Sequence, residues 1–163
     1  MNDVIKTSID SHIQIISNLK AAQQEIKDIA NVVFFALMRG RSIFWYGNGG
    51  SAADSQHMAA ELVSRFKAER RALRSQALTT DTSILTAIGN DYTFEDIFKR
   101  QVEAAVGEGD VCIGLSTSGN SKNIYHAHLK AKELGAKTVS FLGNDGGCIK
   151  EVSDYSITIP SND

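Results

Sequence analysis

The feature that most constrains the fold is a short apolar segment followed at once by a polar turn and a helix, an order that repeats along the chain. Val111–Leu115 is apolar throughout, which is typical of a strand buried on both faces of a parallel sheet. Further strands are expected at 42–46, 75–78, 137–142 and 154–159, with helices between them. Such alternation predicts right-handed crossovers in a parallel sheet. We therefore expect an α/β fold with five parallel strands and helices on both faces, in a single domain over residues 1–163.

Two helices are expected before the first strand. Apolar residues recur at three- and four-residue steps over residues 2–20, at Ile5, Ile9, Ile13, Ile16 and Leu19. A second helix is expected from about Ala22 to Met38, with Gly40 as its stop. We expect these helices, within residues 2–39, to form a helical hairpin that precedes the sheet core of residues 41–163. Core packing would explain both helices, and packing of the hairpin against another subunit is the alternative.

Composition excludes several classes of function. Seventeen basic and nineteen acidic residues give a net charge of −2, and there is no basic tract, which argues against nucleic-acid binding. No apolar run approaches the roughly 18 residues of a membrane-spanning helix, so no membrane partner is expected. The first residues lack a signal-peptide pattern, and two cysteines, Cys112 and Cys148, fit a reducing compartment. A cytoplasmic protein is expected.

The segment Gly47–Ser51, called here the glycine turn, joins the first strand to a helix expected over residues 52–66. Glycines allow a ligand to approach the backbone closely, and the first N–H groups of a helix attract anions. A tight turn needs glycine in any case, so the motif alone is a weak signal. It is neither a Walker motif nor a dinucleotide fingerprint, because no Gly-Lys-Ser/Thr follows and Ala52 occupies the place of the third glycine.

The segment Ser116–Ser121, called here the serine loop, follows the buried strand and precedes another helix. Its hydroxyl and N–H donors could surround a phosphate group. Helix capping is the alternative explanation, because serine, threonine and asparagine are good N-caps. A cap needs one such residue and this loop has five, which favours phosphate binding. The turns at 47–51, 79–81 and 116–121 all follow strands of the predicted sheet, so we expect them to converge on one ligand.

His57 and Glu61 are four residues apart on the expected helix and therefore share one of its faces. An ordinary surface pair is the simplest interpretation of this spacing. The same pair could supply two ligands to one divalent metal, or the glutamate could act as a general base. Their position directly behind the glycine turn favours a role in chemistry.

Several motifs together resemble one known family. In order, the sequence contains Gly47–Ser51, Asp54, Gln56–His57, Glu61, Leu85–Tyr92, Phe98–Glu103, Gly109–Asp110 and Ser116–Ser121. Their order and spacing resemble the phosphoheptose isomerase branch of the sugar-isomerase (SIS) domain family, over nearly the whole chain. The resemblance implies a flavodoxin-like SIS domain in a cytoplasmic homotetramer, with the N-terminal helices packed between subunits.

The resemblance also implies an activity and a set of site residues. The activity is aldose–ketose isomerisation of sedoheptulose 7-phosphate to D-glycero-D-manno-heptose 7-phosphate through an enediol, in bacterial heptose and lipopolysaccharide biosynthesis. The implied catalytic residue is Glu61, which would also bind substrate. The other implied substrate-binding residues are Asn48, Gly49, Gly50, Asn90, Asp91, Ser116, Thr117, Ser118 and Ser121.

A zinc ion in each subunit is implied too, with His57 and Glu61 among its ligands. In the family a further helix follows the region that corresponds to residues 160–163, and it carries a glutamine and a histidine that complete the metal site. The sequence given stops at Asp163, so we expect the family's C-terminal helix to be absent from it and the zinc site to be incomplete in this chain. Either the sequence is a fragment, or the molecule lacks a complete site.

One alternative function belongs to a different class. A related SIS-domain tetramer is not an enzyme and binds the bacterial replication initiator DnaA. That relative has a histidine but no glutamate on the corresponding helix, and it has Gly-Thr-Ser where this chain has Gly49-Gly50-Ser51. Glu61 and Gly50 therefore favour the isomerase, whereas Ser51-Ala-Ala53 and Gln56 resemble the DnaA-binding relative.

Overall fold

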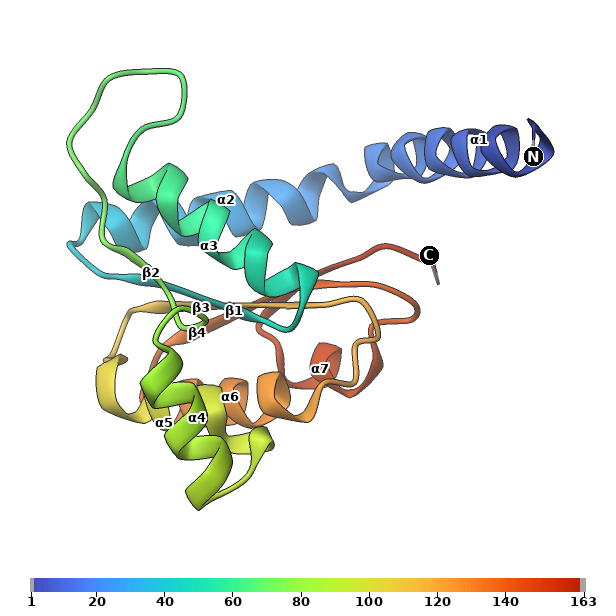
Figure 1. The fold of residues 1–163 in the computed structure, drawn as a ribbon. Coiled ribbons are helices and arrows are strands. Elements are labelled where there is room, and N and C mark those ends of the chain that lie inside the picture. The colour runs from blue at the N-terminus through green and yellow to red at the C-terminus, as the bar shows by residue number, and fades with distance from the viewer. Residues whose placement is uncertain (1, 162–163) are drawn as a thin grey trace.

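A computed structural model describes residues 2–161 and contains one five-stranded parallel sheet in the order β2-β1-β3-β4-β5 (Figure 1). This confirms the expected α/β fold. The strands are β1 (Ile43–Gly47), β2 (Ser75–Ala77), β3 (Val111–Ser116), β4 (Lys137–Leu142) and β5 (Tyr155–Thr158). Strand β4 matches its predicted range, and each of the other strands differs from its prediction by one residue at one or both ends.

The central strand β3 is buried as its apolar sequence predicts. It pairs with β1 from Val111 opposite Ile43 to Leu115 opposite Gly47, and it pairs with β4 on its other side. Helices cover both faces of the sheet at this strand, so neither set of alternating side chains faces solvent. Ser116, the last residue of β3, therefore lies at the carboxyl end of the strand, where the chain leaves the sheet.

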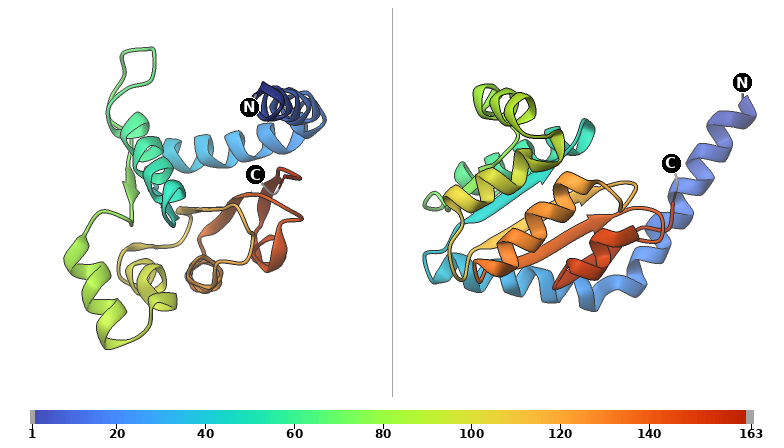
Figure 2. Two further views of the ribbon diagram at one scale, coloured as in Figure 1. Left: turned by 45° about the vertical axis from the view of Figure 1, so that its right-hand side comes forward. Right: turned by 90° about the horizontal axis from the view of Figure 1, so that it is seen from below.

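The helices divide between the two faces, as Figure 2 shows. One face is covered by α2 (Gln23–Met38) and α3 (Gly50–Val63), and the other by α5 (Ile97–Ala105), α6 (Lys122–Glu133) and α7 (Gly147–Val152), with α4 (Thr82–Asp91) beside α5. Successive side chains of β1 point to opposite faces of the sheet. Trp45 packs against α2 and α3, and Tyr46 packs against α5 and α6. Two apolar cores therefore hold the sheet between two helical layers.

The expected N-terminal hairpin is wrong. Helix α1 (Asn2–Asn18) and α2 follow one another end to end, joined by the 3-10 turn η1 (Leu19–Ala22), and α1 extends beyond the sheet (Figure 1). The backbone stays right-handed helical at Asn18 and Gln23, so the chain bends without reversing its direction. The stripe of isoleucines on α1 consequently remains exposed. Among the described residues, no helix has both the length and the apolar content to cross a membrane.

Two glycine-containing segments are helical in the structure. The short helix α7 begins at Gly147, because Gly146 takes a left-handed conformation and directs the chain into a helix. Helix α4 contains Gly89 and continues to Asp91. A single glycine weakens a helix without breaking it when packing holds the turn.

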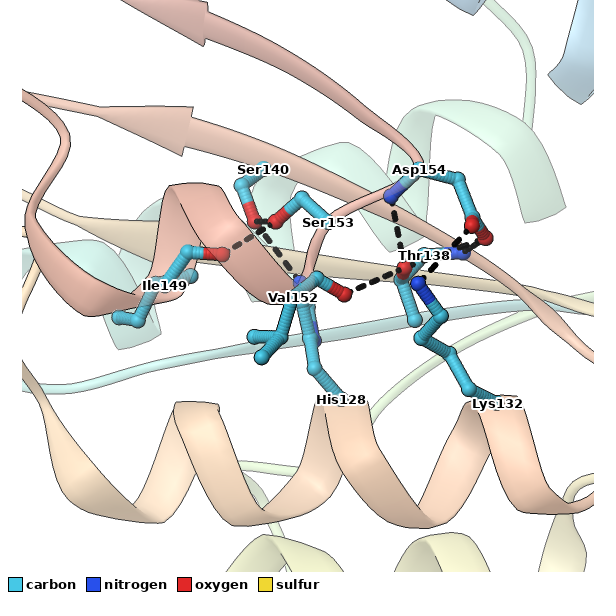
Figure 3. A network of polar contacts seen from close by, with 8 residues as sticks. All are labelled: His128, Lys132, Thr138, Ser140, Ile149, Val152, Ser153 and Asp154. Carbon is cyan, nitrogen blue, oxygen red and sulfur yellow. Dashed lines mark hydrogen bonds and ion pairs between the residues drawn. The ribbon is translucent and has the colours of Figure 1, made fainter.

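A buried polar network connects β1, α6, β4 and α7 on the α6 side of the sheet, and Figure 3 shows its larger part. His128 Nδ1 lies 2.7 Å from the Tyr46 hydroxyl, and its Nε2 lies 2.8 Å from Ser140 Oγ. Ser140 Oγ lies 2.7 Å from Ser153 Oγ, which donates to the carbonyl of Ile149 at 2.7 Å. Every ring nitrogen of this buried histidine therefore has a partner.

Candidate functional site

A cavity of 740 Å³, called here the main cavity, opens at the carboxyl ends of the central strands. The serine loop contributes Ser116, Thr117 and Ser118 to its wall, and α3 contributes Ser51 and Asp54. The rest of the wall comes from η1, α2 and the ends of β3, β4 and β5, through Leu19, Ile26, Leu115, Phe141, Leu142, Gly143, Asn144, Ile157, Ile159 and Ser161. Ligands of open α/β sheets bind at this edge, and the sequence predicts the site there.

The serine loop gathers its hydroxyl groups instead of using them as a helix cap. Ser116 Oγ lies 3.1 Å from Ser121 Oγ and 3.5 Å from Ser118 Oγ, and it accepts a hydrogen bond from the N–H of Gly119 at 3.1 Å. Ser121 is the N-cap of α6, yet its side chain makes no capping hydrogen bond. The capping explanation therefore does not account for these residues, and a cluster of hydroxyl donors beside the cavity remains.

The shape of the serine loop is fixed by close backbone packing. Gly119 has a φ of +69°, and a Cβ built at this residue would lie 2.3 Å from the carbonyl oxygen of Gly146. The neighbouring Asn120 side chain accepts a hydrogen bond from the N–H of Cys148 at 3.1 Å. The loop is thus held against the start of α7, which limits the movement of its hydroxyl groups.

The glycine turn lies at the adjacent strand end. Gly49 is the N-cap of α3 with a φ of +55°, a conformation that side chains disfavour, and no side chain caps the helix. Asn48 forms two hydrogen bonds with Asn123 on α6: its Nδ2 donates at 3.0 Å and its Oδ1 accepts at 2.8 Å. The structure therefore places Asn48, Gly49 and Gly50 next to the cavity wall at Ser51.

Helix α3 carries the candidate catalytic pair. His57 Nε2 lies 3.2 Å from Glu61 Oε1, with the histidine side chain 73% exposed and the glutamate 31% exposed. The spacing of Asp54, His57 and Glu61 puts them on one face of the helix, with Glu61 about 10 Å beyond Asp54 along its axis. Glu61 does not line the main cavity of the described chain, but it lies on the helix face that continues from it.

Arg70 stabilises the end of α3 that carries Glu61. Its guanidinium donates to the carbonyl of Glu61 at 2.6 Å and to the carbonyl of Leu62 at 2.9 Å. The last carbonyls of a helix lack partners within it, and a positive charge there also suits the helix dipole. The segment after α3, which the sequence suggests is an ordinary charged loop, thus contains a capping residue.

His57 and Glu61 are two side chains whose chemistry suits zinc. Two ligands on one tetrahedral zinc ion are separated by about 3.4 Å, and the Nε2–Oε1 distance of the His57–Glu61 pair is 3.2 Å. A catalytic zinc usually has three protein ligands, however. Within residues 2–161 there is no group of three or more histidine, cysteine, aspartate and glutamate side chains that could hold a metal ion. The described chain supplies part of a donor set.

Two predicted residues lie apart from the others. Asn90 and Asp91 end α4, where the Asn90 side chain donates to Asp91 Oδ1 at 2.8 Å, and Asp91 lines a separate cavity between α4 and α5. Because α4 follows the edge strand β2, it lies beside α5 and away from the ends of β1 and β3. The turn at 79–81 also misses the main cavity, since Thr79 contacts Gln56 and Ala52 of α3 instead.

Sequence reasoning from the residues did not single out Asn123 or Arg70 as functional. Asn123 lies on an amphipathic helix, and its contact with Asn48 joins residues 75 positions apart. Arg70 lies in a charged segment that looks solvated. Asp54, which lines the main cavity, appears in the sequence analysis only as one of the motifs of the resemblance, and its place on the helical face of His57 and Glu61 is a second signal for it.

The sequence and the fold are both similar to those of known proteins. Residues 9–143 match the SIS domain family. The phosphoheptose isomerase of Geotalea uraniireducens is 52% identical over 164 residues, which cover 100% of this chain and 87% of that protein. The structure of a phosphoheptose isomerase from Francisella tularensis superposes with a TM-score of 0.94 at 33% identity, covering 99% of this chain and 86% of that one. The structure of a phosphoheptose isomerase from Neisseria gonorrhoeae superposes with a TM-score of 0.91 at 37% identity, covering 98% of this chain and 86% of that one.

Proposed function

The chain belongs to the SIS domain family, and we propose that it is an isomerase of heptose phosphates that converts sedoheptulose 7-phosphate to D-glycero-D-manno-heptose 7-phosphate. Relatives that match the whole chain at about half identity carry the name phosphoheptose isomerase, which supports a sugar-phosphate substrate. We further propose that the product enters bacterial heptose and lipopolysaccharide biosynthesis.

The observation that carries this proposal is the hydroxyl cluster of Ser116, Ser118 and Ser121 at the main cavity, next to the face of α3 that leads to Glu61. Hydroxyl and N–H donors suit a phosphate group, and a carboxylate suits proton transfer at carbon. A seven-carbon sugar phosphate in an extended form could place its phosphate at the serine loop and its first two carbons near Glu61. Thr117 and the glycine turn, with Asn48, Gly49 and Gly50, would bind the sugar between these ends.

The proposed reaction moves a proton between two neighbouring carbons. Glu61 takes a proton from C1 of the ketose, and the electron pair of that C–H bond forms the double bond of the enediol. The π pair of the C2 carbonyl moves to its oxygen, which takes a proton from water and becomes a hydroxyl group. Glu61 then returns its proton at C2, while the C1 hydroxyl releases its proton to water and becomes the aldehyde carbonyl. An ionised carboxylate only accepts hydrogen bonds, so in this geometry His57 Nε2–H donates to Oε1 and orients the carboxylate. A zinc ion bound by both residues would take the place of that proton.

A zinc ion is proposed to bind His57 and Glu61, with its remaining ligands from outside residues 2–161. When bound, such an ion would polarise the substrate oxygens and stabilise negative charge that develops on them. We expect zinc to raise the melting temperature of the purified protein and His57→Ala to abolish that increase. A melting temperature that does not change on addition of zinc would contradict the proposal.

We also propose that the protein is a cytoplasmic homotetramer. The exposed isoleucines of α1 support an assembly, because a monomer rarely leaves so regular an apolar stripe in water. Both cysteines are unpaired, which suits a reducing compartment. Substrate residues that lie apart in one chain, such as Asn90 and Asp91, would in this proposal contribute to a site between subunits.

The decisive experiment is an isomerase assay with sedoheptulose 7-phosphate, comparing the wild type with Glu61→Gln. The amide cannot accept the carbon-bound proton, so we expect kcat to fall by about 10²- to 10⁴-fold. The matched control is Glu103→Gln, which changes an exposed carboxylate on α5 and should leave kcat unchanged. Wild-type activity in Glu61→Gln would refute the catalytic role, and an inactive wild type would refute the substrate.

The DnaA-binding alternative stays a prediction that the same preparation can test. Retention of purified DnaA by the immobilised wild-type protein, together with no isomerase activity, would favour it over the proposed enzyme.

A further inference from the structure

A reciprocal contact between two side-chain amides joins the glycine turn to α6, the helix that follows the serine loop. Asn48 follows β1 and Asn123 lies in the first turn of α6, and each amide donates to the other, at 3.0 and 2.8 Å. In the sheet, Gly47 pairs with Leu115, so the glycine turn and the serine loop leave neighbouring strands at the same level. The amide pair therefore connects the glycine turn, proposed to hold the sugar, to the first turn of the helix that begins where the serine loop ends.

The burial of Asn123 indicates that this contact is specific. Asn123 is 3% exposed, whereas Asn48 is half-buried and borders the open site. A buried amide needs partners for its N–H and oxygen, and those of Asn123 lie on Asn48. Each amide uses one N–H and one oxygen lone pair in the contact, which leaves one N–H and one lone pair of Asn48 for a ligand.

Few side chains of the glycine turn restrict its backbone conformation. Gly49 and Gly50 have none, Gly49 has a φ of +55°, and no side chain caps α3. A glycine-rich segment has many accessible backbone conformations, so a single fixed side chain restricts it strongly. Asn48 is the side chain of this turn whose contact reaches across to α6.

We propose that Asn123 is a positioning residue for the substrate site, which holds Asn48 and thereby fixes the glycine turn relative to the serine loop. The inference rests on the proposed function in one respect, since it takes the glycine turn to contact the sugar. Asn123 acts through Asn48 and does not itself touch the substrate. Its loss therefore weakens substrate binding more than it slows the proton transfer at Glu61.

The test compares Asn123→Leu and Asn123→Asp with the wild type. Leucine has a similar size and no hydrogen-bonding group, and aspartate keeps the shape but cannot donate to Asn48 Oδ1. Removing uniform binding raises KM and leaves kcat nearly unchanged, and we expect KM to increase at least about tenfold. If leucine prevents folding, the nearly isosteric aspartate variant provides the measurement.

The matched control is Gln101→Leu. Gln101 is another buried amide, but it donates to the backbone carbonyls of Leu78 and Ile97 and lies outside the main cavity. This variant should lower the melting temperature without raising KM. An equal KM in wild type and both Asn123 variants, or an equal increase in Gln101→Leu, would overturn the proposal.

A measurement independent of catalysis separates this inference from the proposed function. Backbone hydrogen exchange at residues 47–51 should accelerate in Asn123→Leu and remain at the wild-type rate in Gln101→Leu. If the wild type does not isomerise the sugar phosphate, the proposed function fails, and the exchange rates still decide whether Asn123 fixes the turn. Unchanged exchange in Asn123→Leu would refute the positioning role.

Discussion

At the scale of single residues, the protonation state of His128 follows from the direction of its hydrogen bonds. Ser153 donates to the carbonyl of Ile149, which can only accept, so Ser153 must accept from Ser140. Ser140 then has no second hydrogen, and His128 Nε2 must donate to it. The Nδ1 atom is left as the acceptor for Tyr46, whose burial raises the pKa of its phenol well above the usual value. The network requires a neutral imidazole.

This requirement predicts acid-sensitive stability. Burial lowers the pKa of His128 from 6.5 to about 4, so the unfolded chain binds a proton at pH 5 that the folded protein does not. The stabilisation of the folded state that results from this lowered pKa is complete above pH 6.5 and is lost as the pH falls toward 4. The free energy of unfolding falls by roughly 3 kcal/mol in total. Denaturant unfolding at a series of pH values measures this loss.

A control uses the other histidine of α6. His126→Gln should keep the slope of unfolding free energy between pH 7 and pH 5, because this side chain takes no part in the buried network. A free energy of unfolding that stays constant over that range in the wild type would contradict the assignment.

At the scale of elements, α3 depends on a residue outside it. The helix begins without a side-chain cap at Gly49, and its carboxyl end is held by Arg70, which bonds to the carbonyls of Glu61 and Leu62. The catalytic candidate thus lies in the last turns of a helix whose end is fixed by a distant side chain.

Loss of this cap should destabilise the protein. We expect Arg70→Ala to lower the free energy of unfolding by about 1.5–3 kcal/mol, because the carbonyls of Glu61 and Leu62, and also those of Ser64 and Arg71, lose a charged donor. Arg70→Lys should recover only part of the loss, since a lysine presents a point charge in place of a planar fork. Urea titration gives both values. Arg71→Ala, at the exposed neighbouring residue, is the control, and equal effects of the two alanine variants would disprove the capping role.

At the scale of the whole molecule, α1 carries an apolar face that the described chain leaves uncovered. Ile5, Ile9, Ile13 and Ile16 are each more than half exposed, at 57%, 54%, 58% and 51%. Burial of side chains of this size stabilises an assembly by about 1.5–3 kcal/mol each. The proposed homotetramer would gain much of its stability from this stripe.

The corresponding prediction concerns the state of assembly. Lysines at two of these residues, in the double variant Ile9→Lys/Ile13→Lys, would have to be buried in the interface, so we expect dissociation into smaller species. Analytical ultracentrifugation measures this. Gln14→Lys adds a charge at an exposed residue away from the stripe and should preserve the wild-type mass. A wild type that sediments as a monomer would refute the tetramer outright.

The sheet and the positions of its turns can be predicted from the sequence alone. An apolar run such as Val111–Leu115 is typical of an inner strand that is buried on both faces of a parallel sheet. The glycine turn and the serine loop each follow such a strand, so both were expected at the same edge of the sheet. The spacing of His57 and Glu61 was enough to predict their contact, because helix geometry is local.

The contacts between those elements depend on how the whole chain packs. The pairing of Asn48 with Asn123 and the network around His128 join residues far apart in sequence, and no local pattern specifies such partners. The end-to-end arrangement of α1 and α2 was likewise undetermined, since both helices show the same apolar periodicity whether the chain reverses between them or continues. Periodicity fixes which face of a helix is apolar, and the surrounding fold fixes what that face meets.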